Sequence, residues 1–152
     1  MSVLRAGDSF EFTFQFSVDR VQAFARVVGD DNPIHLDEAY ARGSGFGHRI
    51  VHGMFLAGLV SRALGCDLPG PGTIYMGQEL SFMAPVSVED RVRVVLEVLE
   101  LRPKGRVRIA TRIFLADGTQ VVDGEALVRA PRARVDTATP GRKDVRREHG
   151  GN

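Results

Sequence analysis

Hydrophobic and polar residues along the chain follow a pattern that predicts one early strand, several helices and four later strands. Residues 10–16 alternate strictly between phenylalanine and polar side chains, so that four aromatic rings share one face of a strand. Apolar residues at helical spacing follow between Ser17, which can cap a helix, and Gly29, which can end one. A second, short helix is expected around residues 37–42, after a loop over residues 30–35.

A central helix is predicted over residues 51–64, which are apolar on nearly every side. The segment is shorter than the roughly 20 residues that cross a bilayer, so a buried core helix is expected. Four strand-like runs follow, separated by turn-forming residues: 73–83, 91–101, 106–115 and 120–130. One early strand, one apolar helix and four later strands predict an α+β domain, in which an antiparallel β-sheet wraps around the helix.

The composition fits one globular domain, which we place at residues 1–130. The chain has 152 residues, 43% of them hydrophobic, and a formal net charge of +1. That balance gives no general attraction for nucleic acid or for an anionic membrane, so neither is an expected partner. Cys66 is the only cysteine, which excludes an internal disulfide and a thiolate metal cluster. The first residues lack the apolar segment of a secretory signal, and a soluble, cytoplasmic protein is expected.

Residues 131–152 differ in composition from the rest of the chain. They contain six Lys/Arg, three Asp/Glu and no aromatic residue, and they show no sustained helical or strand period. The segment is therefore expected to be a disordered basic tail. An arm that binds nucleic acid or a membrane is the alternative, but acidic residues are interspersed and no apolar face accompanies the basic ones.

Asp30 and His35 are the first candidates for chemistry. Five positions apart on a continuous helix, their side chains would point away from each other. Pro33 forbids that helix, and the turn it requires can bring a carboxylate and an imidazole together around one water molecule. Such a pair is suited to general acid–base catalysis. The alternative is structural: Asp30 and Asp31 cap the turn, and His35 packs.

Gly53 is the second candidate, because it lies at the start of the apolar helix. The first amides of a helix have no internal partner, so the Gly53 N–H can meet a developing oxyanion. A glycine required only for packing is the alternative. His48 and His52, four residues apart, could bind a metal, but no third ligand is marked and no glutamate lies between them. No metal is expected.

Three segments carry a resemblance to a known family. They are Gly29-Asp-Asp-Asn-Pro-Ile-His35-Leu-Asp37, Arg49-Ile-Val-His-Gly-Met54 and Leu68-Pro-Gly-Pro-Gly-Thr-Ile-Tyr75. Together they resemble the (R)-specific enoyl-CoA hydratases of the MaoC-like family, over roughly residues 5–130. The family's acid lies five residues before the histidine, which selects Asp30 over Asp31. Asp31 is a mild departure from the family pattern, and its carboxylate is placed to perturb the pKa of Asp30.

The resemblance implies a hot-dog fold, a homodimer joined edge to edge, and reversible hydration of trans-2-enoyl-CoA to (3R)-3-hydroxyacyl-CoA without a cofactor. It assigns the acid–base work to Asp30 and His35, with Asp30 taking the proton of the water and His35 orienting the water or relaying a proton. The Gly53 N–H would be the oxyanion donor, and Ser61 would line the acyl pocket.

Three other functions stay open at this point. The nearest is a MaoC-like dehydratase of another acyl thioester, including one bound to a carrier protein. The others are a hot-dog thioesterase and a non-catalytic module that binds acyl-CoA. An acid–base pair beside an oxyanion donor favours the hydratase, because a binding module needs neither.

Overall fold

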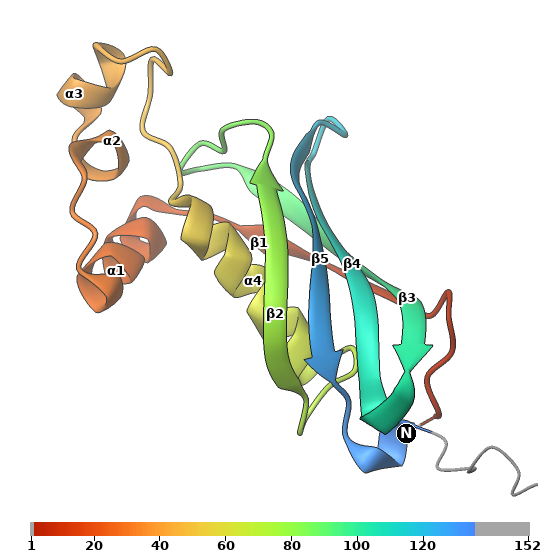
Figure 1. Ribbon diagram of the computed structural model, residues 1–152. Coiled ribbons are helices and arrows are strands. Elements are labelled where there is room, and N and C mark those ends of the chain that lie inside the picture. Colours follow the sequence, from red (N-terminus) through yellow and green to blue (C-terminus); the bar gives the residue numbers. More distant parts are fainter. Residues whose placement is uncertain (1, 136–152) are drawn as a thin grey trace, which may run out of the picture.

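A five-stranded antiparallel sheet wraps around one long helix, α4, in the computed structural model, which describes residues 2–135 (Figure 1). The strands lie in the order β1-β3-β4-β5-β2, so β1 and β2 form the two edges of the sheet. The strands are β1 (Ser9–Gln15), β2 (Ile74–Phe82), β3 (Arg91–Arg102), β4 (Arg106–Leu115) and β5 (Gln120–Arg129). The helices are α1 (Val18–Val28), α2 (Pro33–Leu36), α3 (Glu38–Arg42) and α4 (Gly53–Cys66), with 3-10 turns at Pro103–Gly105 and Arg132–Arg134.

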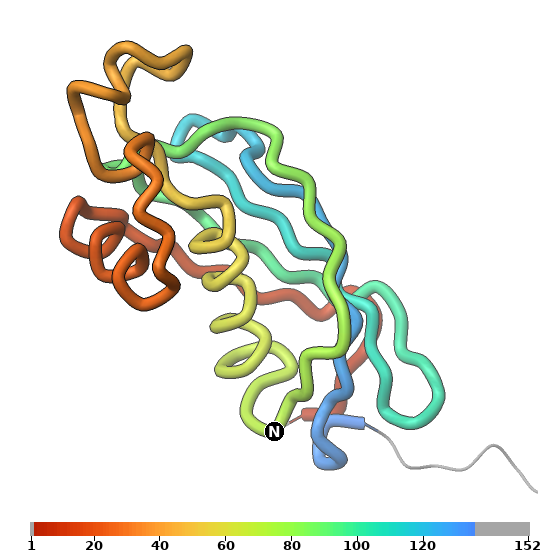
Figure 2. Tube along the Cα trace, turned by 60° about the vertical axis from the view of Figure 1, so that its left-hand side comes forward, coloured from red at the N-terminus to blue at the C-terminus, as the bar shows by residue number. Residues whose placement is uncertain are grey.

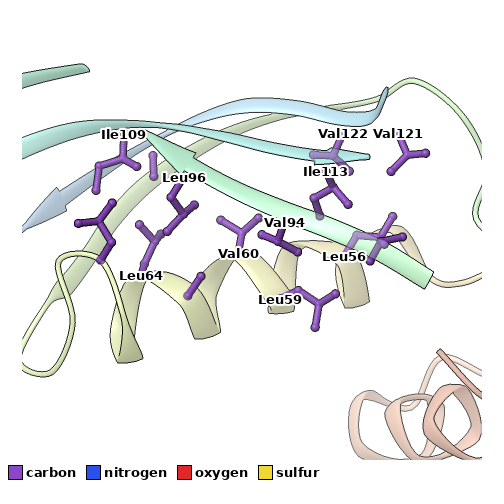
Figure 3. Close-up of a cluster of buried hydrophobic side chains, with 14 of the residues drawn as sticks. Leu56, Leu59, Val60, Leu64, Val94, Leu96, Ile109, Ile113, Val121 and Val122 are labelled. Atoms are coloured by element: carbon purple, nitrogen blue, oxygen red, sulfur yellow. The ribbon is translucent and has the colours of Figure 1, made fainter. Parts of the chain in front are cut away.

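The hydrophobic core lies between α4 and the concave face of the sheet (Figure 3). One face of α4 is buried and contacts inward-facing aliphatic residues of β3, β4 and β5. Burial of each such side chain contributes roughly 1.5–3 kcal/mol to folding. The labelled core residues are Leu56, Leu59, Val60, Leu64, Val94, Leu96, Ile109, Ile113, Val121 and Val122. The opposite face of the sheet is solvated and carries ion pairs such as Arg112–Glu97, at 3.1 Å. The helix therefore covers one face only, as the alternating pattern predicts.

The predicted elements are confirmed with small shifts of their ends. Ser17 caps α1, its hydroxyl accepting from the Arg20 N–H, and Gly29 ends that helix in the left-handed region at φ 79°. The predicted loop over residues 30–35 is instead partly helical, because Asn32 caps one turn of helix and Pro33 occupies its first position.

The described chain continues past the predicted domain end at residue 130. The Leu4 N–H donates to the carbonyl of Arg134, and Val135 packs against the core. Most of the predicted tail, residues 136–152, lies outside the described residues. Within residues 2–135, no helix is long and apolar enough to cross a membrane.

Helices α1 and α2 lie near the N-terminal end of α4, and α3 lies farther out (Figure 2). The Ile50 N–H donates to the carbonyl of Ile34 at 3.3 Å, so the segment before α4 runs along α2. This arrangement brings the loop that follows α1 to the N-terminus of α4. The two sequence segments that hold the candidate residues therefore meet at one place.

Candidate active site

The turn that contains Asp30 is shaped by side chains that bond to the nearby backbone. The Asn32 N–H donates to Asp30 Oδ1 at 3.3 Å, and the Ile34 N–H donates to Asn32 Oδ1 at 3.2 Å. Aspartate and asparagine favour such turns because their short side chains imitate a backbone acceptor. The turn keeps the Asp30 carboxylate half-exposed, with its second oxygen, Oδ2, directed toward His52 at 4.0 Å from Nε2.

His35 is held in one orientation by the chain segment before α4. Its Nδ1 lies 2.7 Å from the carbonyl oxygen of Ile50. A carbonyl only accepts, so Nδ1 carries the proton and, in the neutral ring, Nε2 keeps a lone pair. The half-buried imidazole can therefore accept a proton or a hydrogen bond at Nε2.

Asp30, His35 and His52 converge at this point. A carboxylate oxygen of Asp30, one ring nitrogen of His35 and one ring nitrogen of His52 lie within 4.8 Å of one another. One water molecule with hydrogen bonds of about 2.8 Å on each side bridges such a gap. The structure thus brings Asp30 and His35 together, as the spacing around Pro33 predicts.

The same three groups have the composition of a metal site, but their geometry suits a metal poorly. The rings of His35 and His52 are stacked, with centroids 3.8 Å apart and planes inclined by 26°. Imidazole lone pairs lie in the plane of the ring, so those of two nearly parallel rings do not converge on one ion about 2.0–2.1 Å from each nitrogen. A site without metal stays a prediction.

Asp31 points to a different part of the surface. It lines a separate hollow of about 360 Å³ together with Gln22, Arg26 and Leu36. Among the described residues, the carboxylate that groups with His35 and His52 is that of Asp30. The structure thus places Asp30 beside the two histidines, and its role as the acid–base residue stays a prediction.

His52 is the site residue that the sequence argument missed, since we considered it only as a metal ligand beside His48. It immediately precedes α4 and is 2% exposed, whereas His48 is exposed and stands outside the cluster. Its Nε2 lies 3.1 Å from the carbonyl oxygen of Asp30, and its ring also contacts Phe24, with centroids 5.0 Å apart. Its place in the segment Arg49–Met54, next to Gly53, was the available signal.

Burial lowers the pKa of His52 from its ordinary value. The hydrogen bond to the Asp30 carbonyl acts in the opposite direction, the nearby His35 lowers the pKa further, and the Asp30 carboxylate raises it. Because burial is the largest of these effects, the neutral imidazole is favoured in the folded protein.

The lowered pKa of His52 predicts a loss of stability in mild acid. Below the unfolded value of about 6.5, the unfolded chain binds a proton that the folded chain does not, so the free energy of unfolding falls as the pH decreases toward the folded pKa. We expect the Tm to fall between about pH 7.5 and pH 5.5, and to fall less in His52→Gln. Thermal unfolding across this range measures the difference. His48→Gln should behave like the wild type; an equal fall in His52→Gln would contradict the prediction.

Gly53 is the first residue of α4, and its surroundings are compatible with both the oxyanion interpretation and the packing interpretation. Among the described residues, no backbone acceptor bonds the N–H groups of Gly53 and Met54, so both can donate to a ligand. A Cβ added to Gly53 would lie only 3.0–3.2 Å from the ring of Phe82. The glycine therefore allows close packing by Phe82 and also presents a free amide at the positive end of the helix dipole.

A groove runs from this point along the exposed face of α4. Its volume is about 690 Å³, and it lies between α4 and the edge strand β2. Met54 and Phe82 line it near Gly53, and Ser61 lines it farther along, about 12 Å up the helix axis. The apolar residues on the outer side of α4 thus line a surface groove, which explains why the helix is hydrophobic on nearly every side.

The architecture and this site define the molecule as a hot-dog protein with a carboxylate and two imidazoles gathered at the N-terminus of its central helix. Residues 5–114 match the MaoC like domain, and the chain belongs to that family. The 3-hydroxybutyryl-CoA dehydratase of Methylorubrum extorquens is 48% identical over 119 residues, 78% of this chain and 75% of the relative. The (R)-specific enoyl-CoA hydratase of Aeromonas caviae is 46% identical over 129 residues, 84% of this chain and 96% of the relative. The structure of an unliganded R-hydratase from Pseudomonas aeruginosa superposes with a TM-score of 0.81 and 52% identity, covering 84% of this chain and 83% of that one.

Proposed function

We propose that this protein is a hydro-lyase that catalyses the reversible hydration of trans-2-enoyl-CoA to (3R)-3-hydroxyacyl-CoA. The observation that carries the proposal is the convergence of the Asp30 carboxylate and the His35 imidazole within 4.8 Å, next to the N-terminus of α4. The names of the relatives from Methylorubrum extorquens and Aeromonas caviae support the same class of reaction.

In the proposed mechanism, Asp30 and His35 act on one water molecule. Both the carboxylate and the His35 Nε2 accept from the water, so its lone pair is free to attack C3 of the enoyl group. Asp30 takes one proton as the C3–O bond forms, and the pair returns a proton to C2, which leaves the enzyme as it began. The Gly53 N–H stabilises the negative charge that develops on the thioester oxygen. Coenzyme A enters only as part of the substrate, and no cofactor or metal takes part.

Product analysis with crotonyl-CoA tests this proposal. Hydration removes the absorbance of the enoyl thioester and leaves coenzyme A esterified, so no free thiol should appear. A thioesterase would release free coenzyme A, and a binding module would change neither signal. Either of these results would overturn the assignment.

The groove between α4 and β2 is the proposed acyl-binding site. It begins at Met54, next to Gly53, and is lined mostly by apolar side chains, with the Ser61 hydroxyl as one of its polar groups. An acyl chain whose thioester oxygen meets the Gly53 N–H would extend along α4 toward Ser61. One cysteine and no internal disulfide fit a reducing compartment, and we propose that the enzyme acts in the cytoplasm.

Gly53→Ala is expected to lower kcat by about tenfold to 10²-fold, less than the loss of a whole oxyanion donor, because the amide remains and only its surroundings change. The new methyl group meets the Phe82 ring, which is half-exposed and can move, so the Tm should fall only slightly. Steady-state kinetics and thermal unfolding measure the two effects.

The double variant Gly53→Ala/Phe82→Leu separates the two roles of Gly53. Leucine removes the ring atoms that meet the methyl group. If Gly53 serves the oxyanion, the double variant regains stability but not kcat. Recovery of full kcat would show that Gly53 is needed only for packing against Phe82.

We also propose that the protein is a homodimer joined along β2. This strand is an edge of the sheet and pairs only with β5 among the described strands. An unpaired edge strand with exposed apolar residues favours pairing with a second copy. The exposed apolar residues on or next to β2 are Ile74, Tyr75, Met76, Phe82 and Met83. A partner along this edge would also cover the open side of the groove.

Introducing positive charge on this surface tests the dimer. The double variant Ile74→Lys/Met76→Lys places two cations on β2, where repulsion across a twofold axis should dissociate the dimer. Light scattering should give about twice the chain mass of 16.6 kDa for the wild type and a single chain mass for the variant. Val27→Lys is the matched control, because Val27 is exposed on α1, away from β2. A wild-type monomer would contradict the proposal.

A further inference from the structure

His52 occupies the N-cap position of α4 without capping the helix. Its side chain makes no capping hydrogen bond, although N-cap residues are usually selected for one. It is also one of two buried polar residues within residues 2–135, the other being Thr111. A polar side chain is costly to bury, so the imidazole is expected to serve something other than the helix.

The hydrogen bond between His52 and Asp30 determines the tautomer of the His52 ring. The carbonyl oxygen of Asp30 accepts, so the Nε2 at 3.1 Å carries the proton. Nδ1 is then left with its lone pair, and it is buried with no hydrogen-bond partner among the described residues. This bond joins α4 to the Asp30 turn, 22 residues earlier in the chain.

The His52 ring also forms a wall against His35. The two imidazoles stack with centroids 3.8 Å apart, while His35 is bonded to the carbonyl of Ile50 through Nδ1. His35 is thus bonded at its edge to Ile50, and the His52 ring packs against its face. The His52 side chain thus contacts both the Asp30 turn and the His35 ring. Its backbone leads directly into Gly53, so all three groups lie next to this one residue.

We propose that His52 is a positioning residue, which holds the Asp30 turn and the His35 ring at the separation that one bridging water requires. The inference rests on the proposed hydration, because it assigns His52 a role in that reaction. His52 does not touch the substrate in this account. It acts by fixing the two residues that do.

The neutral state of His52 is part of this role. The titratable groups that face its ring are the Asp30 carboxylate, from the loop after α1, and His35, from α2; the wall supplied by α1 is the uncharged Phe24. A cationic His52 would pair with the Asp30 carboxylate and make it a weaker base. Burial lowers the pKa of His52 and so favours the neutral ring.

Three substitutions separate the hydrogen bond from the stacked ring. His52→Gln keeps an N–H donor at about the position of Nε2. The asparagine side chain is one carbon shorter, so its N–H cannot reach the Asp30 carbonyl. His52→Phe keeps an aromatic face but has no donor. We expect kcat for crotonyl-CoA to fall about 10²-fold in the Asn and Phe variants, because a displacement of about 1 Å has effects of that size. His52→Gln should stay within about threefold of wild type, and KM should change by less than about threefold in all three, since the groove is untouched.

Kinetics and NMR of the intact protein decide the proposal. The Nδ1–H resonance of His35 should be retained in His52→Gln and lost to exchange in the Asn and Phe variants. Without the hydrogen bond to the Asp30 carbonyl, the turn that leads into α2 is no longer held, and His35 moves away from the Ile50 carbonyl. Wild-type kcat in His52→Asn and His52→Phe, even with a lowered Tm, would overturn the proposal, as would an equal loss in His52→Gln. If the wild type hydrates no enoyl-CoA, only the proposed function is overturned. Retention of the His35 Nδ1–H resonance in the Asn and Phe variants would overturn the positioning role, whatever the activity.

Discussion

Replacing Asp30 by asparagine should lower kcat for crotonyl-CoA hydration by about 10²–10⁴-fold, the range expected for loss of a general acid–base group. Asparagine keeps the size of the side chain and can still accept from the Asn32 N–H at 3.3 Å. The turn should therefore survive, and the Tm should change little. The loss should appear in kcat more than in KM, because the carboxylate acts on the water rather than on the thioester.

Asp31→Asn is the matched control for this prediction. It makes the same chemical change one residue later, on a side chain that faces the separate hollow beside Arg26. Most of the activity should remain, and at most the pH profile should move through the charge near Asp30. Loss of turnover in Asp31→Asn with retention in Asp30→Asn would overturn the choice between the two carboxylates.

His35→Gln should cause a loss of similar size, about 10²–10⁴-fold in kcat. The glutamine amide ends at about the position of Nε2, but it cannot take a proton as Nε2 does. If Asp30 and His35 act on the same water, the double variant Asp30→Asn/His35→Gln should be little worse than the poorer single variant, because residues that work as a unit are strongly non-additive.

Steady-state kinetics of the wild type, the two single variants and the double variant gives this double-mutant cycle. Losses that simply multiply in the double variant would mean that the two residues act in separate steps. A single variant with wild-type kcat would remove that residue from the acid–base pair.

Local sequence patterns predicted most of the fold. Three of the alternating phenylalanines of residues 10–16 lie in β1, and Phe16 directly follows the strand. Phe16 is in the core, and the other three rings pack against it. The turn of helix at α2 was missed because four residues are too few for a periodic pattern, although Asn32 and Pro33 are a common start of a helix.

The site was predictable only in part. Pro33 excludes a continuous helix, which is a local constraint, so the spacing allowed Asp30 and His35 to meet, and the family resemblance selected this arrangement over a structural role. The stacking of His52 on His35 depends on how the segment before α4 lies along α2, and nothing in the local sequence specifies that contact. The groove lined by Ser61 could not be predicted locally either. Its second wall is β2, and the position of that strand beside α4 depends on its pairing with β5 at the edge of the sheet.

The measurement that tests the central claim most directly is the configuration of the hydration product. In the proposed mechanism, water held between Asp30 and His35 can reach only one face of an enoyl group that the Gly53 N–H and the groove along α4 hold. Chiral analysis of the 3-hydroxybutyryl group formed from crotonyl-CoA should therefore give a single configuration, and the name of the Aeromonas caviae relative leads us to expect (3R). A (3S) product, or a mixture of both, would contradict the account.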